Sequence, residues 1–322
     1  AMTVKRIFSL LLALALLAAL AGCGKREPTP DKPDEPTPPP EDGITLAELN
    51  VEFVAGERNP DELMKLKKEL PPLLIDALAD EGVTVGKVNV TFGASDEATA
   101  DALARGTVQV GFVPMETYLA HDDALRPVCS QIPTPDMSLD TVFLLFTESE
   151  RSLAAQEQPI ASDYVTAHIG ELVWLLPEGD ETAERFAAYW VERNCGVPFE
   201  EVPVEYYTDA DALAPDAGDI LVLRCMDSAL PKGACVFDSC ILWGELIVVQ
   251  AANPITGSDT FALALQNAMD SIWTDDTEGQ AVIAHYSSGE SHILYTSTSA
   301  ERYDTTRYVL GYSDDPAPQG EK

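Results

Sequence analysis

Residues 87–120 read KVNVTFGASDEATADALARGTVQVGFVPMETYLA and place a helix pattern between two strand patterns. Lys87–Phe92 alternates apolar and polar residues, as a half-buried strand does. Ser95–Arg105 has the pattern of a helix, with Ser95 as its cap and acidic residues in its first turn. Val108–Val113 is a second strand pattern, and a short helix is expected at Met115–Ala120. Together these segments predict a right-handed crossover between two parallel strands.

The same alternation of strands and helices continues on both sides of this unit. Asn59-Pro60-Asp61-Glu62 predicts a helix start, because it combines a capping side chain, a proline at the first helical position and acids that face the helix dipole. Pro71-Pro72 is expected to end or kink that helix. Further strands are expected at Leu49–Ala55, Glu171–Leu176 and Asp219–Arg224, and further helices at Thr182–Arg193 and from Ser258, with Phe261, Leu265, Met269 and Ile272 on one stripe.

Two apolar runs divide the chain. Thr141–Phe146 and Leu242–Val249 bracket its middle section, and we expect them to be two strands that cross between lobes. The predicted fold class is α/β, with two lobes that are each a mostly parallel sheet flanked by helices. Residues 44–140 together with 245–312 are expected to form one lobe, and residues 141–244 the other.

The N-terminal segment predicts export. Lys5 and Arg6 precede an uncharged apolar run that ends in Leu20-Ala21-Gly22-Cys23. A charged start, an apolar middle and small residues at the cleavage point make residues 1–22 a secretory signal peptide, and the run is too short for an ordinary transmembrane helix. The last four residues resemble the bacterial lipobox, which implies a lipid on Cys23. The alternative is a plain secretory peptide in which Cys23 has no special role.

A tether follows the expected lipid-anchored cysteine. Residues 27–43 contain seven prolines among acidic residues and threonines, with almost nothing apolar. Such a segment cannot bury enough surface to fold, and its prolines keep it extended and semi-rigid. We therefore expect residues 23–43 to hold a folded body away from the outer face of the cell membrane. Residues 313–322 are expected to be a flexible tail.

The composition excludes several functions. The formal net charge is −34, and removal of a leader that holds Lys5 and Arg6 but no acid makes it more negative still. This charge argues against binding nucleic acid or anionic lipid through the surface. The chain contains no nucleophile elbow and no glycine-rich phosphate loop, and the spacing of its histidines fits no metal motif. We expect no enzymatic activity, no cofactor and no metal site.

The cysteines leave the pairing open. Besides Cys23 there are five, at positions 129, 195, 225, 235 and 240, and an odd number cannot pair completely within one chain. Export would permit a disulfide, and Cys235 and Cys240 are nearest in sequence.

Three segments resemble the phosphonate-type periplasmic solute-binding proteins of ABC importers. They are Val108–Leu119 with the preceding Ser-Asp-Glu-Ala-Thr helix start, the run Leu246–Gln250, and the helix from Ser258 to Trp273 with Ala284-His285-Tyr286 after it. The resemblance implies a two-lobed periplasmic-binding-protein fold of type II, two crossover strands and a small ligand in the cleft. It also implies an ABC permease as partner, and a monomer is expected.

The expected ligand site lies at the carboxyl ends of the strands, where helix N-termini offer free N–H groups. Tyr118 matches the family's ligand-contacting tyrosine. Ser95 and Thr117 could donate hydroxyl hydrogen bonds, and Arg58 or Arg224 could pair with an anion. Asn59 and Thr182 lie in the same set of loops, after the first strand and at Pro177–Thr182.

The loop Pro177–Thr182 departs from the family's pattern. It is acidic, whereas the family carries a Ser-Thr-Ser-Gly turn that grips an oxyanion. Its carboxylates would repel a phosphonate, unless they only complement a helix dipole at the surface. Three classes of ligand therefore remain open: a phosphonate-like anion, a zwitterion and a cation. The phosphonate-like anion is the leading candidate. The chain is expected to deliver this solute to an importer; the alternatives are a sensing or partner-binding lipoprotein of the same fold and, less favoured, an exported enzyme.

Overall fold

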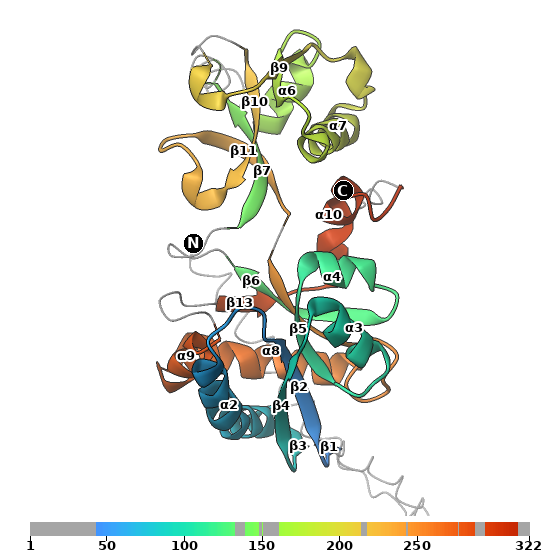
Figure 1. Cartoon of the computed structure of the whole chain (residues 1–322). Coiled ribbons are helices and arrows are strands. Elements are labelled where there is room, and N and C mark those ends of the chain that lie inside the picture. Colours follow the sequence, from blue (N-terminus) through green and yellow to red (C-terminus); the bar gives the residue numbers. More distant parts are fainter. Residues whose placement is uncertain are drawn as a thin grey trace, which may run out of the picture. The chain divides into compact units, whose positions relative to one another are not determined.

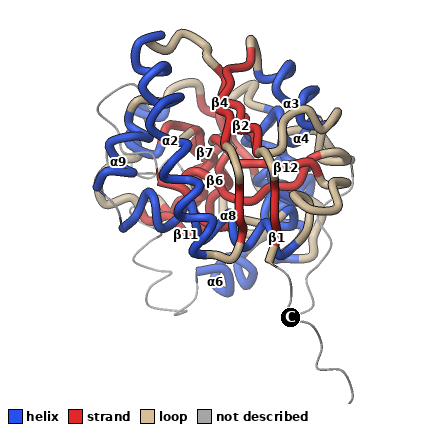
Figure 2. The backbone as a smooth tube through the Cα atoms, turned by 90° about the horizontal axis from the view of Figure 1, so that it is seen from below, coloured by secondary structure: helices blue, strands red, loops and turns tan. Residues whose placement is uncertain are grey.

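The computed structural model describes residues 43–132, 139–147, 150, 161–213, 218–242, 244–275, 277–286 and 294–314. The expected signal peptide, Cys23 and nearly all of the tether lie outside this part, as do residues 315–322. The described residues form a mixed α/β fold, in which helices flank two large sheets (Figures 1 and 2).

A six-stranded sheet is built from both ends of the described chain. Its strands run in the order β13-β6-β12-β5-β2-β4, where β2, β4 and β5 are parallel neighbours and the remaining pairs are antiparallel. The strands are β2 (Leu49–Val54), β4 (Val88–Gly93), β5 (Val110–Pro114), β6 (Leu125–Ile132), β12 (Glu245–Gln250) and β13 (Leu294–Ser297). A small parallel pair, β1 (Ile44–Leu46) and β3 (Val83–Val85), forms a separate two-stranded sheet.

A five-stranded sheet is formed by the middle of the chain. Its order is β11-β7-β10-β8-β9, with β8, β9 and β10 parallel and β7 antiparallel to both of its neighbours. Its strands are β7 (Asp140–Phe146), β8 (Trp174–Pro177), β9 (Val204–Tyr207), β10 (Ile220–Met226) and β11 (Cys235–Ile241).

The sheets differ from the prediction in one respect. Each has a parallel core of three strands, as expected, but antiparallel strands extend it, so that the sheets are mixed rather than mostly parallel. The cause is the passage of the chain between the sheets. The chain leaves β6 to begin β7, and leaves β11 to begin β12, so each passage adds a strand that runs against the parallel core.

The two apolar runs also differ in detail from the prediction. Thr141–Phe146 lies wholly within β7 of the five-stranded sheet, while β12 lies wholly within the six-stranded sheet. No described strand is shared between the large sheets. Short links make the passage: residues 242–244, of which 243 is not described, and residues 133–139, of which only Leu139 is described.

The helices begin where the sequence places their caps. Asn59, Ser95 and Ser258 each accept a hydrogen bond from a backbone N–H of the following helix, which confirms these three predictions. Pro71 and Pro72 do not end the first of these helices, which continues to Asp80. The helices are α2 (Pro60–Asp80), α3 (Asp96–Ala104), α4 (Met115–Ala120), α6 (Ala161–His168), α7 (Glu181–Cys195), α8 (Asp259–Asp270), α9 (Thr277–Ala284) and α10 (Asp304–Val309), with a π-helical turn at Ser271–Asp275.

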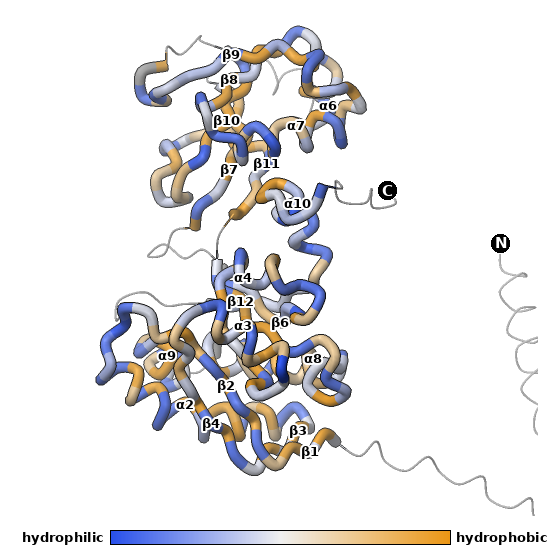
Figure 3. The backbone as a smooth tube through the Cα atoms, turned by 45° about the vertical axis from the view of Figure 1, so that its right-hand side comes forward, coloured by the Kyte–Doolittle hydropathy of each residue, from blue (hydrophilic) through white to orange (hydrophobic). Residues whose placement is uncertain are grey.

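Each large sheet has its own hydrophobic core. Figure 3 shows the apolar segments concentrated along the strands. In the six-stranded sheet, Phe53 stacks on Phe112 with ring centroids 4.0 Å apart. Gly111 lets α3 approach the sheet closely, because a Cβ at this position would lie 2.5 Å from Leu103 Cδ1. In the five-stranded sheet, Trp174 is fully buried against Trp190.

The C-terminal segment contributes to packing on both sheets. Tyr303 belongs to a buried cluster with residues of α4 and β12, whereas Val309 packs in the core of the five-stranded sheet. Among the described residues, no helix combines the length and apolar character needed to cross a membrane.

Candidate functional site

The described residues of the 242–244 link, and Glu245 after it, are held in place by hydrogen bonds. The backbone N–H of Leu242 donates to Asp140 O over 2.8 Å, and that of Met115 donates to Gly244 O over 2.8 Å. The backbone N–H of Glu245 donates to the side-chain Oε1 of Gln131 over 2.9 Å. The start of β12 is therefore fixed against both β5 and β6.

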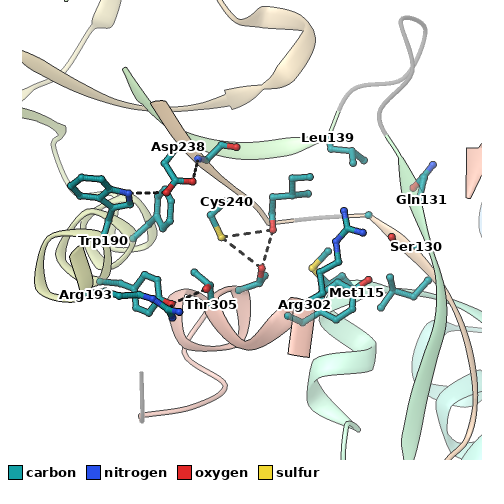
Figure 4. Close-up of a pocket in the computed structure, with 18 of the residues that line it drawn as sticks. Met115, Ser130, Gln131, Leu139, Trp190, Arg193, Asp238, Cys240, Arg302 and Thr305 are labelled. Atoms are coloured by element: carbon teal, nitrogen blue, oxygen red, sulfur yellow. Dashed lines mark hydrogen bonds between the residues drawn. The ribbon is translucent and has the colours of Figure 1, made fainter. Parts of the chain in front are cut away.

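A cavity of about 440 Å³ lies beside these links (Figure 4). The six-stranded sheet and its loops contribute Met115, Ser130, Gln131 and Glu245 to the lining. The five-stranded sheet and α7 contribute Tyr189, Trp190, Arg193, Asn194, Asp238 and Ser239, and the C-terminal segment contributes Arg302, Tyr303, Thr305 and Thr306. The two large sheets with their helices and the C-terminal segment thus surround one space.

Both carboxylates in this lining already have hydrogen-bond donors. Asp238 Oδ2 accepts from the indole Nε1 of Trp190 over 2.7 Å, and its Oδ1 accepts from the backbone N–H of Ser239 over 2.8 Å. Figure 4 shows Trp190 and Asp238 facing each other on the α7 side of the cavity. Asp238 therefore joins α7 to β11.

Glu245 is the buried carboxyl of the site. Its Oε2 accepts from the hydroxyl of Tyr286 over 2.5 Å, and its Oε1 accepts from the hydroxyl of Tyr295. Burial raises the pKa of the Glu245 carboxyl, while these two hydroxyl bonds and the Arg58 guanidinium oppose that rise. Arg58 Nη2 lies 4.0 Å from Glu245 Oε2.

The two arginines in the lining have no carboxylate partner among the described residues. Arg193 Nη1 donates to the hydroxyl of Tyr189, and the guanidinium also faces that ring. Arg302 is exposed on the turn before α10, and Figure 4 shows its side chain directed into the cavity. Since both acids already accept hydrogen bonds and neither arginine has a carboxylate partner in the described part of the chain, the unneutralised charge of the cavity lining is cationic, with hydroxyl and amide donors around it.

Arg58 and Asn59 lie at the end of β2, as the sequence predicts, but neither lines the cavity. Arg58 donates to Tyr286 O and Val54 O over 3.0 and 2.9 Å, and it contacts the cavity only through Glu245. Asn59 caps α2 through a 2.9 Å bond from the backbone N–H of Asp61.

Ser95, Thr117 and Tyr118 also lie outside the cavity lining. Ser95 accepts from the backbone N–H of Ala98 over 3.2 Å as the cap of α3. Tyr118 is 1% exposed and packs edge-on against Tyr303, with ring centroids 5.6 Å apart. Burial raises the pKa of Tyr118 to about 12. Thr117 is half-buried on α4.

Arg224 and Thr182 lie at the carboxyl ends of β10 and β8. Arg224 pairs with Asp140 over 2.7 Å and with Asp180 over 3.5 Å, and Asp180 also caps α7 by accepting from the backbone N–H of Ala183. This acid of the 177–182 loop therefore serves the helix dipole and an ion pair, as one of the two sequence-based interpretations expects. Thr182 is half-buried in the first turn of α7 and does not line the cavity.

Sequence patterns gave a weak signal for the residues that do line the cavity. Phe186, Tyr189, Trp190 and Arg193 follow helical spacing on one face of α7, and the aromatic side chains of such a face predict core packing rather than a binding site. Glu245 is a single charged residue at the start of an otherwise apolar strand. A carboxyl in such a buried position needs partners, and this is a sequence signal for a special role. No sequence motif around Arg302 indicates that it lines a cavity.

The described cysteines and acids provide no cross-link and no metal cluster. Cys129, Cys195, Cys235 and Cys240 are free thiols, and burial raises the pKa of Cys129 and Cys240 to about 12. Within the described ranges, no group of three or more His, Cys, Asp or Glu side chains is placed to hold a metal ion.

The chain matches no protein-family model and no curated protein sequence. Solved structures similar to it include PhnD1 from Prochlorococcus marinus in complex with methylphosphonate, at 12% identity and a TM-score of 0.39, covering 83% of this chain and 99% of that one. The binding protein of a Pseudomonas aeruginosa ABC phosphonate transporter gives 10% identity, a TM-score of 0.40 and coverages of 82% and 85%. The periplasmic aliphatic sulphonate binding protein SsuA from Escherichia coli is 15% identical at a TM-score of 0.35, and the match covers 84% of this chain and 94% of that one.

Proposed function

We propose that this chain is an extracytoplasmic solute-binding lipoprotein that delivers a small oxyanion, with a phosphonate as the leading candidate, to an ABC importer. The observation that carries the proposal is the cavity beside the two links, which combines side chains from both large sheets and from the C-terminal segment. A volume of about 440 Å³ suits a small solute.

The charges of the lining favour an anion. Arg193 and Arg302 have no carboxylate partner in the described part of the chain, whereas Asp238 and Glu245 already accept two hydrogen bonds each. An oxyanion would pair with the arginines without displacing any of these bonds. A cationic solute would meet two arginines of like charge in the lining, and the carboxylates that could attract it already accept two hydrogen bonds each. The phosphonate itself is suggested by the sequence resemblance.

The division into lobes is part of the same proposal. Residues 44–140 with 245–312 would form one lobe and residues 141–244 the other, and the links at 133–139 and 242–244 would act as the hinge. A ligand that contacts both lobes would then favour a closed form. Saturating ligand is expected to reduce the radius of gyration in small-angle scattering, and an unchanged value would argue against closure.

The anchor and the partner complete the proposal. A lipid on Cys23 would hold the chain at the outer face of the membrane, and the proline-rich tether would give the body access to a permease. The strongly negative charge supports a soluble monomer and opposes contact with anionic lipid or nucleic acid.

A thermal-shift screen tests the proposed ligand class. The panel is methylphosphonate, inorganic phosphate, methanesulfonate, a primary amine and a neutral amino acid, each at a concentration well above its expected Kd. Binding to the native state alone stabilises by RT ln(1 + [L]/Kd), or about 2.7 kcal/mol at one hundred times Kd. The proposal expects a rise in melting temperature with an anion of this panel and none with the amine. A rise with the amine alone would contradict it.

A further inference from the structure

Tyr189 is one of the residues that line the cavity. It lies on α7, its side chain is 6% exposed, and its ring packs against Tyr308 of α10 with centroids 5.7 Å apart. The place of Tyr189 on the apolar face of this helix predicts core packing, and no sequence motif marks its hydroxyl. The buried position calls for a partner for the hydroxyl, because an unsatisfied polar group in a dry environment is costly.

The hydroxyl oxygen of Tyr189 accepts two hydrogen bonds. One comes from Arg193 Nη1, one turn further along α7, and the other comes from Thr305 Oγ1 over 3.0 Å. A phenol has one proton to donate besides its acceptor capacity. Two incoming donors occupy the acceptor directions, and the described residues provide no acceptor for the proton. The O–H bond therefore has to point away from both donors.

The second donor comes from a different part of the chain. Thr305 lies on α10, which β13 and a short turn connect to the six-stranded sheet. Contacts on both sides hold this C-terminal strap (residues 300–309) in place, two of them made by arginine side chains. Arg307 Nε donates to Asp122 Oδ2 over 2.6 Å at the end of α4, and Arg185 Nη2 of α7 donates to Tyr308 O over 2.8 Å. Tyr189 is thus the point at which α7 meets the strap inside the cavity.

We propose that Tyr189 is a ligand-binding residue whose hydroxyl donates a hydrogen bond to an oxygen of the anion that Arg193 binds, and that Thr305 is a positioning residue for this hydroxyl. The inference rests on the proposed function. The donor set for the anion is complete only when the strap is docked on α7, because Thr305 fixes the direction of the Tyr189 O–H bond. The site therefore depends on the C-terminal segment even where that segment does not touch the ligand.

The test uses Tyr189→Phe, Thr305→Val and the double variant in the full chain, with methylphosphonate, inorganic phosphate and methanesulfonate as probes for calorimetry. Tyr308→Phe is the matched control, because its ring lies beside Tyr189 while its hydroxyl makes no hydrogen bond within the described ranges. Melting temperatures of all variants separate binding effects from folding effects.

Tyr189→Phe is expected to weaken binding of the probe anion roughly tenfold or more, since a hydrogen bond to a charged group is lost. Thr305→Val is expected to weaken it about threefold in the wild-type background, and to have no effect in the Tyr189→Phe background because it acts through Tyr189. Tyr308→Phe should bind as the wild type does.

Three outcomes count against parts of this account in distinguishable ways. If the wild type binds a probe anion and Tyr189→Phe binds it equally well, Tyr189 is not a ligand residue. If Thr305→Val binds more tightly, Thr305 is not a positioning residue and Tyr189 gives its proton to the threonine. If Thr305→Val changes affinity equally in both backgrounds, Thr305 acts independently of Tyr189 and is not a positioning residue either. If the wild type binds no anion of the panel, the proposed function is overturned and this inference falls with it.

Discussion

Arg58 lies over the ring of Tyr286, with its Cζ 3.9 Å from the ring centroid, so that one guanidinium is stacked on a tyrosine whose hydroxyl donates to Glu245. The same arginine donates to the backbone carbonyls of Tyr286 and Val54. The loop after β2, the end of α9 and the start of β12 are therefore joined at one buried carboxyl. This cluster forms one wall of the cavity through Glu245.

Glu245→Gln is expected to remove a pH dependence of folding stability. Burial raises the pKa of this carboxyl in the folded state above its ordinary value of 4.5. The folded state then binds the proton more tightly than the unfolded state, so the stability contribution is fully present below pH 4.5 and is lost as the pH rises through the folded pKa. The free energy of unfolding of the wild type relative to Glu245→Gln should fall over that range.

Urea unfolding of the two proteins between pH 4 and about pH 8 measures this difference. Glu52→Gln is a suitable control, since Glu52 accepts from Thr91 and Thr99 outside the cavity. A difference between wild type and Glu245→Gln that stays constant with pH would show that the carboxyl does not titrate in this way.

Substitutions at Tyr118 separate two roles of this residue. Its surroundings indicate that it packs in the core, whereas the sequence resemblance implies that it contacts the ligand. Because its ring is buried against Tyr303, Tyr118→Ala is expected to lower the free energy of unfolding by about 3 kcal/mol or more. Tyr118→Phe should cost only about 1 kcal/mol and leave ligand affinity unchanged. Calorimetry with the anion from the screen and thermal melting of both variants provide the two readouts. A loss of affinity in Tyr118→Phe at an unchanged melting temperature would support the ligand role instead.

Cys23→Ala is expected to prevent lipid attachment and to move the chain from the membrane fraction to the soluble fraction. Lipid chains contribute about 0.8 kcal/mol per buried methylene, so their loss removes the anchor. Mass spectrometry of the N-terminal peptide and fractionation of both proteins test this prediction. Wild-type protein that resides in the membrane fraction without lipid on Cys23 would contradict it.

Local features of the fold were predictable from the sequence because short-range interactions determine them. Asn59, Ser95 and Ser258 cap their helices in the expected way, since a cap needs only the next three backbone N–H groups. The mixed character of the sheets was not predictable in this way. It depends on where β7 and β12 are placed after the chain passes between sheets, and no local pattern records that placement.

The candidate site shows the same limit. The sequence correctly places Arg58 and Arg224 at strand ends, but their partners Glu245, Asp140 and Asp180 are identified only by the tertiary structure. Arg193 and Arg302 meet around the cavity because α7 and the strap pack together, a contact between segments that have no shared periodicity. Charged residues at helix ends are common on surfaces, so their position alone could not predict a binding role.

Isothermal titration calorimetry of methylphosphonate, phosphate and methanesulfonate with the wild type, Arg193→Gln and Arg302→Gln measures whether the cavity arginines bind an anion. Arg105→Gln is the matched control, because Arg105 pairs with Asp101 on α3 and does not line the cavity. We expect the wild type and Arg105→Gln to bind an anion with equal affinity, and the loss of either cavity arginine to weaken binding about tenfold or more. Equal affinity in all four proteins would place the anion elsewhere and contradict the account.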